Sequence, residues 1–219
     1  MSGALALVGG GEWGEGCTFD RMLLEESSGD EVLVLPTAAA FEHPERAVEA
    51  AEGHFAALGA RTRGLMVLHR AEAEDEANAA AVRASSFIYL SGGSAMHLRS
   101  VLHGSPLWDA ILAAWHDGAV LAGSSAGAMV LCNPMVDPRG GAFTVGLGLL
   151  VDMAVIPHHD TSPEKTKRTI TLAPEGLPVV AIEEQTALVR QPDGSWRVEG
   201  VGKVVVFLDG QEADLDALP

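Results

Sequence analysis

Short apolar runs recur along the chain, and segments with helical periodicity separate most of them. Several runs are apolar at every position, which is typical of parallel strands that are buried on both faces. Because parallel neighbours need a crossover connection, the alternation favours right-handed βαβ units in a doubly wound α/β sheet flanked by helices. The predicted strands are residues 4–8, 32–36, 64–68, 87–91, 119–123 and 179–183, and the predicted helices are residues 43–58, 74–84, 94–102 and 106–118.

The segment 186–210 departs from this alternation. Strand-like runs flank Pro192-Asp193-Gly194, where the glycine tolerates the positive φ of a tight turn. We therefore expect a C-terminal antiparallel β-hairpin that closes one edge of a mostly parallel sheet. The 219 residues contain no repeat and no low-complexity linker, so we expect one domain over residues 1–219.

Charge and hydropathy exclude several classes of partner. The formal net charge of −16 disfavours nucleic acid and anionic membrane surfaces, because both require a basic face. No apolar run approaches the ~20 residues that span a bilayer, and residues 1–11 do not resemble a secretory signal, so we expect a cytoplasmic enzyme.

The sequence contains two cysteines, Cys17 and Cys132. They have neither metal-site spacing nor a secreted context, and we expect free thiols.

The stretch Gly123-Ser124-Ser125-Ala126-Gly127 matches the pattern G-x-S-x-G. In α/β hydrolases this pattern marks a strand-turn-helix elbow that exposes a nucleophile. It follows a predicted strand, and small residues come after it, as close packing of the next helix on that strand requires. We expect Ser125 to be the nucleophile, with the N–H of Ala126 positioned to donate to an oxyanion.

A second strand end carries Gly92-Gly93, followed by a predicted helix. Glycines there let bare backbone N–H groups approach a ligand or a developing anion, although for this motif alone a tight strand-helix turn is the simpler explanation. His97, three residues after Ser94, is a candidate to face the same cleft or to lie on the helix surface.

A serine hydroxyl needs a base, and His158 and His159 follow the apolar segment 154–157. Adjacent residues of an extended chain point to opposite sides, so we expect only one of the two to reach Ser125. His158-His159-Asp160 also suggests a metal site, but no matching cluster of ligands occurs elsewhere in the sequence, and we expect no metal.

A carboxylate must hold the base in its useful tautomer. Glu183 and Glu184 close the apolar run at 179–183, so one lies at a strand end and the other just beyond it. Composition does not choose among the candidates, which are Asp137, Asp152, Asp160, Glu183 and Glu184.

Taken together, these stretches resemble the aspartyl dipeptidase (peptidase E) and cyanophycinase family of serine peptidases, a relative of the class I glutamine amidotransferase-like fold. The matching stretches run in the family's order from residue 4 to residue 210: ALALVGGGE, YLSGGS, GSSAGAMVL, GLGLL, IPHHD, IEEQTALV and GVGKVVVFLDG.

This resemblance implies a Ser-His-Glu triad made of Ser125, His158 and Glu184. It also implies an oxyanion hole formed by the backbone N–H groups of Gly93 and Ala126. The chemistry needs no cofactor, and related enzymes suggest a possible homodimer.

The chain departs from the family's pattern near the implied histidine. His159 stands where an aromatic residue usually follows it, Lys165, Lys167 and Arg168 replace several arginines, and Ser94 replaces an amide-bearing side chain. If Lys165 and Arg168 border the cleft, they attract a substrate carboxylate. A solvated helix start explains them equally well. Ser94 and His159 are further candidates for substrate binding.

From these features we predict a serine peptidase that hydrolyses a small, Asp-containing peptide through an acyl-enzyme. Three alternatives remain: a cyanophycinase-type exopeptidase acting on β-Asp-Arg units, a glutamine amidotransferase-like hydrolase, and a binding protein without catalytic activity. The amidotransferase chemistry uses a cysteine at the elbow, where this chain has Ser125.

Overall fold

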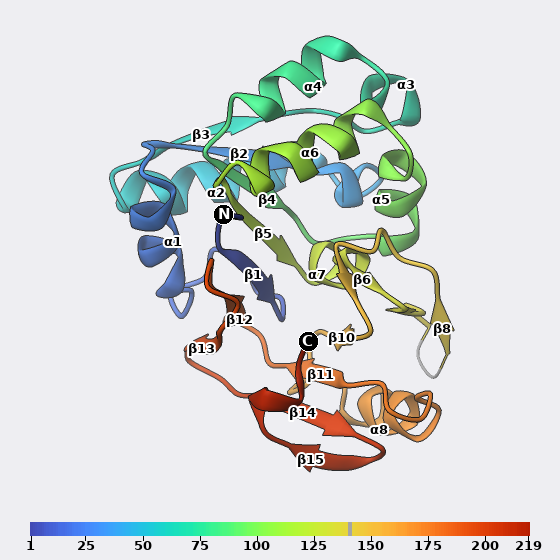
Figure 1. The fold of residues 1–219 in the computed structure, drawn as a ribbon. Coiled ribbons are helices and arrows are strands. Elements are labelled where there is room, and N and C mark those ends of the chain that lie inside the picture. The colour runs from blue at the N-terminus through green and yellow to red at the C-terminus, as the bar shows by residue number, and fades with distance from the viewer. Residues whose placement is uncertain (140–141) are drawn as a thin grey trace.

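The computed structural model describes residues 1–139 and 142–219. A seven-stranded sheet forms its centre (Figure 1). The strands lie in the order β13 (Trp196–Gly200), β12 (Thr186–Arg190), β1 (Leu5–Val8), β5 (Val120–Ser124), β4 (Phe87–Leu90), β2 (Glu31–Leu35) and β3 (Arg61–Gly64). The five strands from β1 to β3 in this order are parallel, whereas β12 and β13 are antiparallel to their neighbours.

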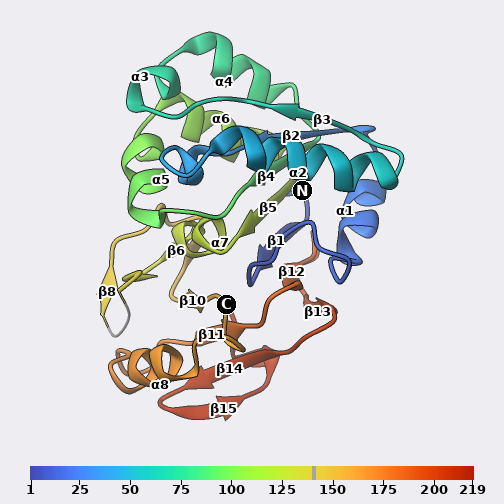
Figure 2. The same ribbon diagram turned by 180° about the vertical axis from the view of Figure 1, so that it is seen from behind.

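Helices cover both faces of this sheet, as the views in Figures 1 and 2 show. On one face lie α1 (Phe19–Ser27) and α2 (Pro44–Ala57), whose Phe19 and Phe55 are buried in a cluster with Tyr89 of β4. On the other face lie α3 (Arg70–Ala73), α4 (Glu76–Arg83), α5 (Ala95–Leu102), α6 (Pro106–His116) and α7 (Ala126–Leu131). The predicted α/β fold, a mostly parallel sheet between helical layers, is confirmed.

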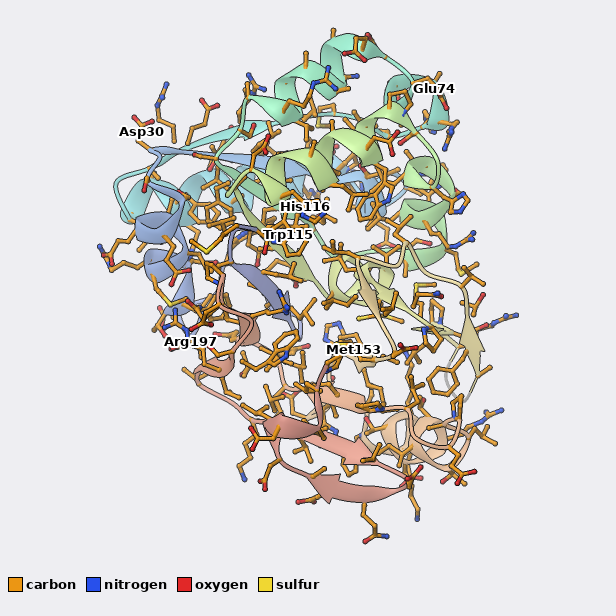
Figure 3. All side chains as sticks on the ribbon, in the orientation of Figure 1. Asp30, Glu74, Trp115, His116, Met153 and Arg197 are labelled. Carbon is orange, nitrogen blue, oxygen red and sulfur yellow. The ribbon has the colours of Figure 1, made fainter. Side chains whose placement is uncertain are left out.

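The predicted hairpin is also confirmed. β12 and β13 pair antiparallel, and the turn between them has Gly194 at φ 89°. Arg197 of β13 lies 2.8 Å from Glu26 of α1, an ion pair that ties the hairpin to the helical layer (Figure 3). The hairpin therefore extends the main sheet beyond β1.

A second, smaller sheet was not predicted. It consists of β10 (Ala154–Ile156), β11 (Val179–Ile182), β14 (Val204–Leu208) and β15 (Gln211–Ala213), with α8 (Pro163–Thr171) beside it (Figure 1). The predicted strand at 179–183 is thus a strand of this second sheet and not of the main one. Buried Met153, labelled in Figure 3, immediately precedes β10.

The described residues also form two short two-stranded ladders. In one, β6 (Cys132–Asn133) pairs with β9 (Leu150–Val151), and in the other, β7 (Met135–Val136) pairs with β8 (Phe143–Thr144). Two 3₁₀ turns are η1 (Thr37–Ala39) and η2 (Leu215–Ala217).

The strand predicted at 64–68 is wrong in position, because β3 covers residues 61–64. β3 is an edge strand whose Arg61 and Arg63 side chains are exposed, so it lacks an apolar run. The apolar residues after β3 form no strand. Val67, one of them, is fully buried, and its carbonyl accepts a hydrogen bond from Thr37 Oγ1 at 2.6 Å.

The two cysteines are free, as predicted, and both are buried. Burial raises the pKa of the Cys17 thiol to about 11 and that of Cys132 to about 12, so both are protonated at neutral pH. In the described part of the chain, no helix is both long and apolar enough to cross a membrane.

Candidate active site

Ser125 lies on a sharp turn between β5 and α7. Its φ of 49° and ψ of −105° are unusual for a residue with a side chain. Its N–H donates to the carbonyl of Val8 at 2.9 Å, which holds the turn against the end of the neighbouring strand β1. The sharp turn predicted from G-x-S-x-G is therefore present.

The glycines of this turn are required by close backbone contacts. A Cβ on Gly123 would lie 2.6 Å from the carbonyl carbon of Gly127, and a Cβ on Gly127 would lie 2.4 Å from the carbonyl oxygen of Leu90. The absence of these two side chains lets α7 start directly against β5 and β4.

Replacing Gly127 with alanine should therefore destabilise the fold. The added methyl group meets backbone that cannot rotate away, and overpacking of this kind costs about 1–3 kcal/mol in the free energy of unfolding. Gly53→Ala is the matched control: nothing lies within 4 Å of its Cβ inside α2, so alanine should stabilise by about 0.5–1 kcal/mol. Urea unfolding measures both. Equal stability of Gly127→Ala and the unmodified protein would contradict the close strand-helix contact.

His158 comes from the second sheet and lies against the elbow. It follows β10, has φ 56°, and its N–H donates to the carbonyl of Gly9 at 2.8 Å. Its Nε2 is 2.8 Å from Ser125 Oγ. A Cβ on Gly10 would lie 2.2 Å from the His158 ring, so that glycine makes room for the imidazole.

Glu184 contacts the other nitrogen of the same ring. Its Oε1 is 2.7 Å from His158 Nδ1, and the two side chains are 35% and 34% exposed, which leaves the pair open to solvent. Ser125, His158 and Glu184, which the resemblance implied, are thus brought into one continuous chain of contacts.

The other candidate acids lie elsewhere or bond differently. Asp160 Oδ1 accepts from the N–H of Glu184 at 3.1 Å, and Glu183 Oε2 accepts from the N–H of Lys203 at 2.8 Å. Asp137 pairs with Arg139 at 2.6 Å, and this contact lowers the pKa of Asp137 to about 2. No contact joins Asp152 to His158 within the described residues.

His159 contacts α8 and the second sheet, and no contact joins it to Ser125 among the described residues. The chain is not extended here, because His158 has φ 56°, so the expected alternation is not what separates the two histidines. His159 Nδ1 lies 3.3 Å from Thr166 Oγ1, and its ring centroid is 6.5 Å from that of Phe207. It lines a cavity of about 360 Å³ between α8 and the second sheet, together with Lys167 and Ile170. The structure therefore separates the two adjacent histidines.

The remaining candidates for substrate binding do not meet the serine. Lys165 and Arg168 lie on α8, and no contact joins either to Ser125, His158 or Glu184 in the described part of the chain. Ser94 caps α5, where its Oγ accepts from the N–H of His97 at 3.3 Å. The His97 ring lies 2.8 Å from the carbonyl of Leu68 and packs on Phe41, so in the described part of the chain it contacts neither Ser125 nor His158.

Gly93, a predicted oxyanion donor, lies in the turn after β4 with φ 133°. A Cβ there would lie 2.4 Å from the carbonyl oxygen of Ala38. Ala126, the other predicted donor, is the first residue of α7. β4 and β5 are neighbours in the sheet, so the two residues follow adjacent strand ends.

Sequence reasoning missed Glu12. Its Oε1 accepts from the N–H of Gly92 at 2.8 Å and its Oε2 accepts from Ser124 Oγ at 2.7 Å. A carboxylate soon after a strand, in the stretch GGGE, was the available signal. Among the described residues, no group of three or more His, Cys, Asp or Glu side chains is arranged to hold a metal ion.

Comparison with known proteins agrees with this geometry. The sequence profile of peptidase family S51 matches residues 5–196. The chain belongs to this family. A cyanophycinase of Synechococcus elongatus is 31% identical over 154 residues, which cover 65% of this chain and 48% of that protein. A cyanophycinase of Geminocystis herdmanii is 30% identical over 172 residues, 72% of this chain and 62% of that protein.

Two solved structures are similar to this chain over more than nine-tenths of its length. A peptidase from an acI-B1 Actinobacterium superposes with a TM-score of 0.87 at 31% identity, covering 97% of this chain and 93% of the other. A putative peptidase E protein from Listeria monocytogenes has the same fold, with a TM-score of 0.68 at 21% identity over 92% and 100% of the two chains. By contrast, the chain spans about half the length of most curated relatives it matches. The predicted family and fold are confirmed.

Proposed function

We propose that this S51 family member is a serine-type peptidase that cleaves short peptides through an acyl-enzyme. The observation that carries the proposal is the pair of contacts from Ser125 Oγ to His158 Nε2 at 2.8 Å and from His158 Nδ1 to Glu184 Oε1 at 2.7 Å. A weak nucleophile, a base within hydrogen-bond reach and an acid that orients the base are the parts that nucleophilic catalysis needs.

In the proposed reaction Ser125 Oγ attacks the carbonyl carbon of the scissile peptide bond. His158 Nε2 takes the hydroxyl proton and then gives it to the leaving amine, while the Nδ1–H donates to Glu184 throughout. The N–H groups of Gly93 and Ala126 stabilise the negative oxygen of the tetrahedral intermediate. A water molecule, deprotonated by His158, then hydrolyses the ester to Ser125.

Cysteine chemistry of the amidotransferase type has no support in this chain. The elbow carries Ser125, and the thiols of Cys17 and Cys132 are buried with raised pKa values of about 11 and about 12. A buried protonated thiol is a poor nucleophile at neutral pH.

Two substrate classes remain candidates within peptidase chemistry. A peptide with an N-terminal aspartate is the first, because the sequence motifs resemble those of the aspartyl dipeptidases. Chains of β-Asp-Arg units are the second, because relatives at about 30% identity are named cyanophycinase.

A substrate panel with a labelling control tests the proposal. The panel contains Asp-X dipeptides, isoaspartyl dipeptides, cyanophycin and neutral dipeptides, and a fluorophosphonate reports the reactivity of Ser125. We expect labelling at Ser125 together with cleavage of one Asp-containing class. Labelling without any cleavage would leave a serine hydrolase with a different substrate, and folded protein that does not label would favour the binding protein without activity.

A further inference from the structure

The Glu12 carboxylate joins two turns that are distant in sequence. It comes from the loop after β1, and its two oxygens accept from the Gly92 N–H at 2.8 Å and from Ser124 Oγ at 2.7 Å, contacts that span 80 and 112 residues. Gly92 belongs to the turn after β4, and Ser124 precedes the nucleophile elbow. One side chain therefore fixes both turns that carry the proposed oxyanion donors.

In the turn after β4, every backbone N–H from Ser91 to Ser94 except one donates a hydrogen bond within the described residues. Ser91 donates to the carbonyl of Leu35 at 3.2 Å, Gly92 donates to Glu12, and Ser94 donates to the carbonyl of Ala38 at 2.8 Å. Within the described residues, the Gly93 N–H between them has no hydrogen-bond acceptor in the protein. Of these three acceptors, two are backbone carbonyls and only Glu12 is a side chain. A substitution at Glu12 can therefore change the support of this turn next to the Gly93 N–H.

The second turn is held in a similar way. The Ser125 N–H donates to the carbonyl of Val8, and the fully buried Ser124 directs its hydroxyl to Glu12. Gly92, Glu12 and Ser125 lie close together. A Cβ on Gly92 would lie 2.9 Å from Glu12 Oε1 and 3.5 Å from Ser125 Cβ.

We propose that Glu12 is a positioning residue that sets the separation between the Gly93 and Ala126 N–H groups. This inference rests on the proposed function. A negative charge beside a developing oxyanion repels it, so the charge itself cannot be the benefit, and the contribution of Glu12 is geometric. Catalytic groups displaced by about 1 Å lose about 10²-fold in rate, which is the scale of effect expected when the link is removed.

A geometric role makes a prediction that separates charge from shape. In Glu12→Gln the amide oxygen still accepts from the Gly92 N–H, and the amide N–H₂ donates to Ser124 Oγ, which then acts as acceptor. We expect Glu12→Gln to keep kcat within about tenfold of the unmodified protein. Glu12→Leu has similar size but no polar atoms, and we expect its kcat to fall by about 10²-fold with KM little changed.

The experiment measures kcat and KM on the cleaved peptide and the second-order rate of Ser125 labelling by a fluorophosphonate. The variants are Glu12→Gln, Glu12→Leu, Ser124→Ala and the double variant Glu12→Leu/Ser124→Ala, with exposed Glu15→Gln as the matched control. Labelling should fall in parallel with kcat in Glu12→Leu. Ser124→Ala should lose part of the rate, and adding it to Glu12→Leu should cost nothing further, because both changes break the same link.

Several outcomes would overturn the inference. Equal loss of kcat in Glu12→Gln and Glu12→Leu would mean that the charge matters, and a rise in KM alone in Glu12→Gln would mean that the carboxylate binds a cationic group of the substrate. If Glu12→Leu does not fold, Glu12→Gln and Ser124→Ala carry the test. Unmodified protein that does not label at all would overturn the proposed function itself, whereas labelling at the same rate in every variant would overturn only the role of Glu12.

Discussion

Ser125→Ala is expected to lower kcat for peptide hydrolysis by a factor on the order of 10⁶. The change removes the atom that would form the covalent intermediate, and His158 at 2.8 Å is left without a hydroxyl to deprotonate. The remaining activity should come from peptide binding and oxyanion stabilisation alone. Initial rates on the cleaved peptide and loss of fluorophosphonate labelling measure the effect.

Two variants control this result. Ser100 is an exposed serine of α5 that donates to the carbonyl of His97 at 2.7 Å, and Ser100→Ala should keep full activity. Ser125→Gly should be as inactive as Ser125→Ala and more stable by about 1 kcal/mol, because glycine adopts φ 49° without strain. Turnover by Ser125→Ala above one thousandth of the original rate would reject Ser125 as the nucleophile.

Glu184→Gln is expected to lower kcat by about 10⁴-fold while the fold is retained. The amide N–H₂ of glutamine would donate to His158 Nδ1, which places the ring proton on Nε2. In that tautomer Nε2 cannot accept the proton of Ser125. The expected split is a large fall in kcat with little change in KM, since Glu184 contacts the base and not the substrate.

Glu183→Gln is the neighbouring control. The Glu183 carboxylate accepts from the N–H of Lys203 at 2.8 Å and makes no contact with His158, so the amide should preserve activity. Asp160→Asn tests the remaining acid, which bonds the Glu184 backbone at 3.1 Å. Full activity in Glu184→Gln together with loss in Asp160→Asn would transfer the orienting role to Asp160.

Local sequence patterns were sufficient to predict the structure wherever the contacts that determine it lie within one short segment. The elbow at Ser125 was predictable because its strand, its turn and its small residues are contiguous. Buried strands such as β4 and β5 were predictable because burial on both faces demands apolar side chains throughout. The edge strand β3 was misplaced for the converse reason, because its exposed positions carry Arg61 and Arg63.

Contacts between distant segments followed no such local pattern. Lys165 and Arg168 were candidates for substrate binding because a basic cluster stands out in a chain of net charge −16, yet α8 carries them beside the second sheet without a contact to Ser125. That second sheet was itself missed, because its strands come from segments that the sequence pattern assigns equally well to the main sheet.

The sequence by itself determined the fold class and the position of the sharp turn at Ser125, because periodicity and small residues act over a few positions. It indicated the family through the resemblance of its ordered motifs. Only the tertiary structure decided that His158 and not His159 meets the serine, that Glu184 completes the contact, and that Glu12 joins two turns. For Glu12 the physical reason is the strand order β1-β5-β4, which brings three strand ends together although 80 or more residues separate Glu12 from its two partners. For His158 and Glu184 the reason is the parallel pairing of β10 and β11, because each residue lies just after the end of one of these neighbouring strands.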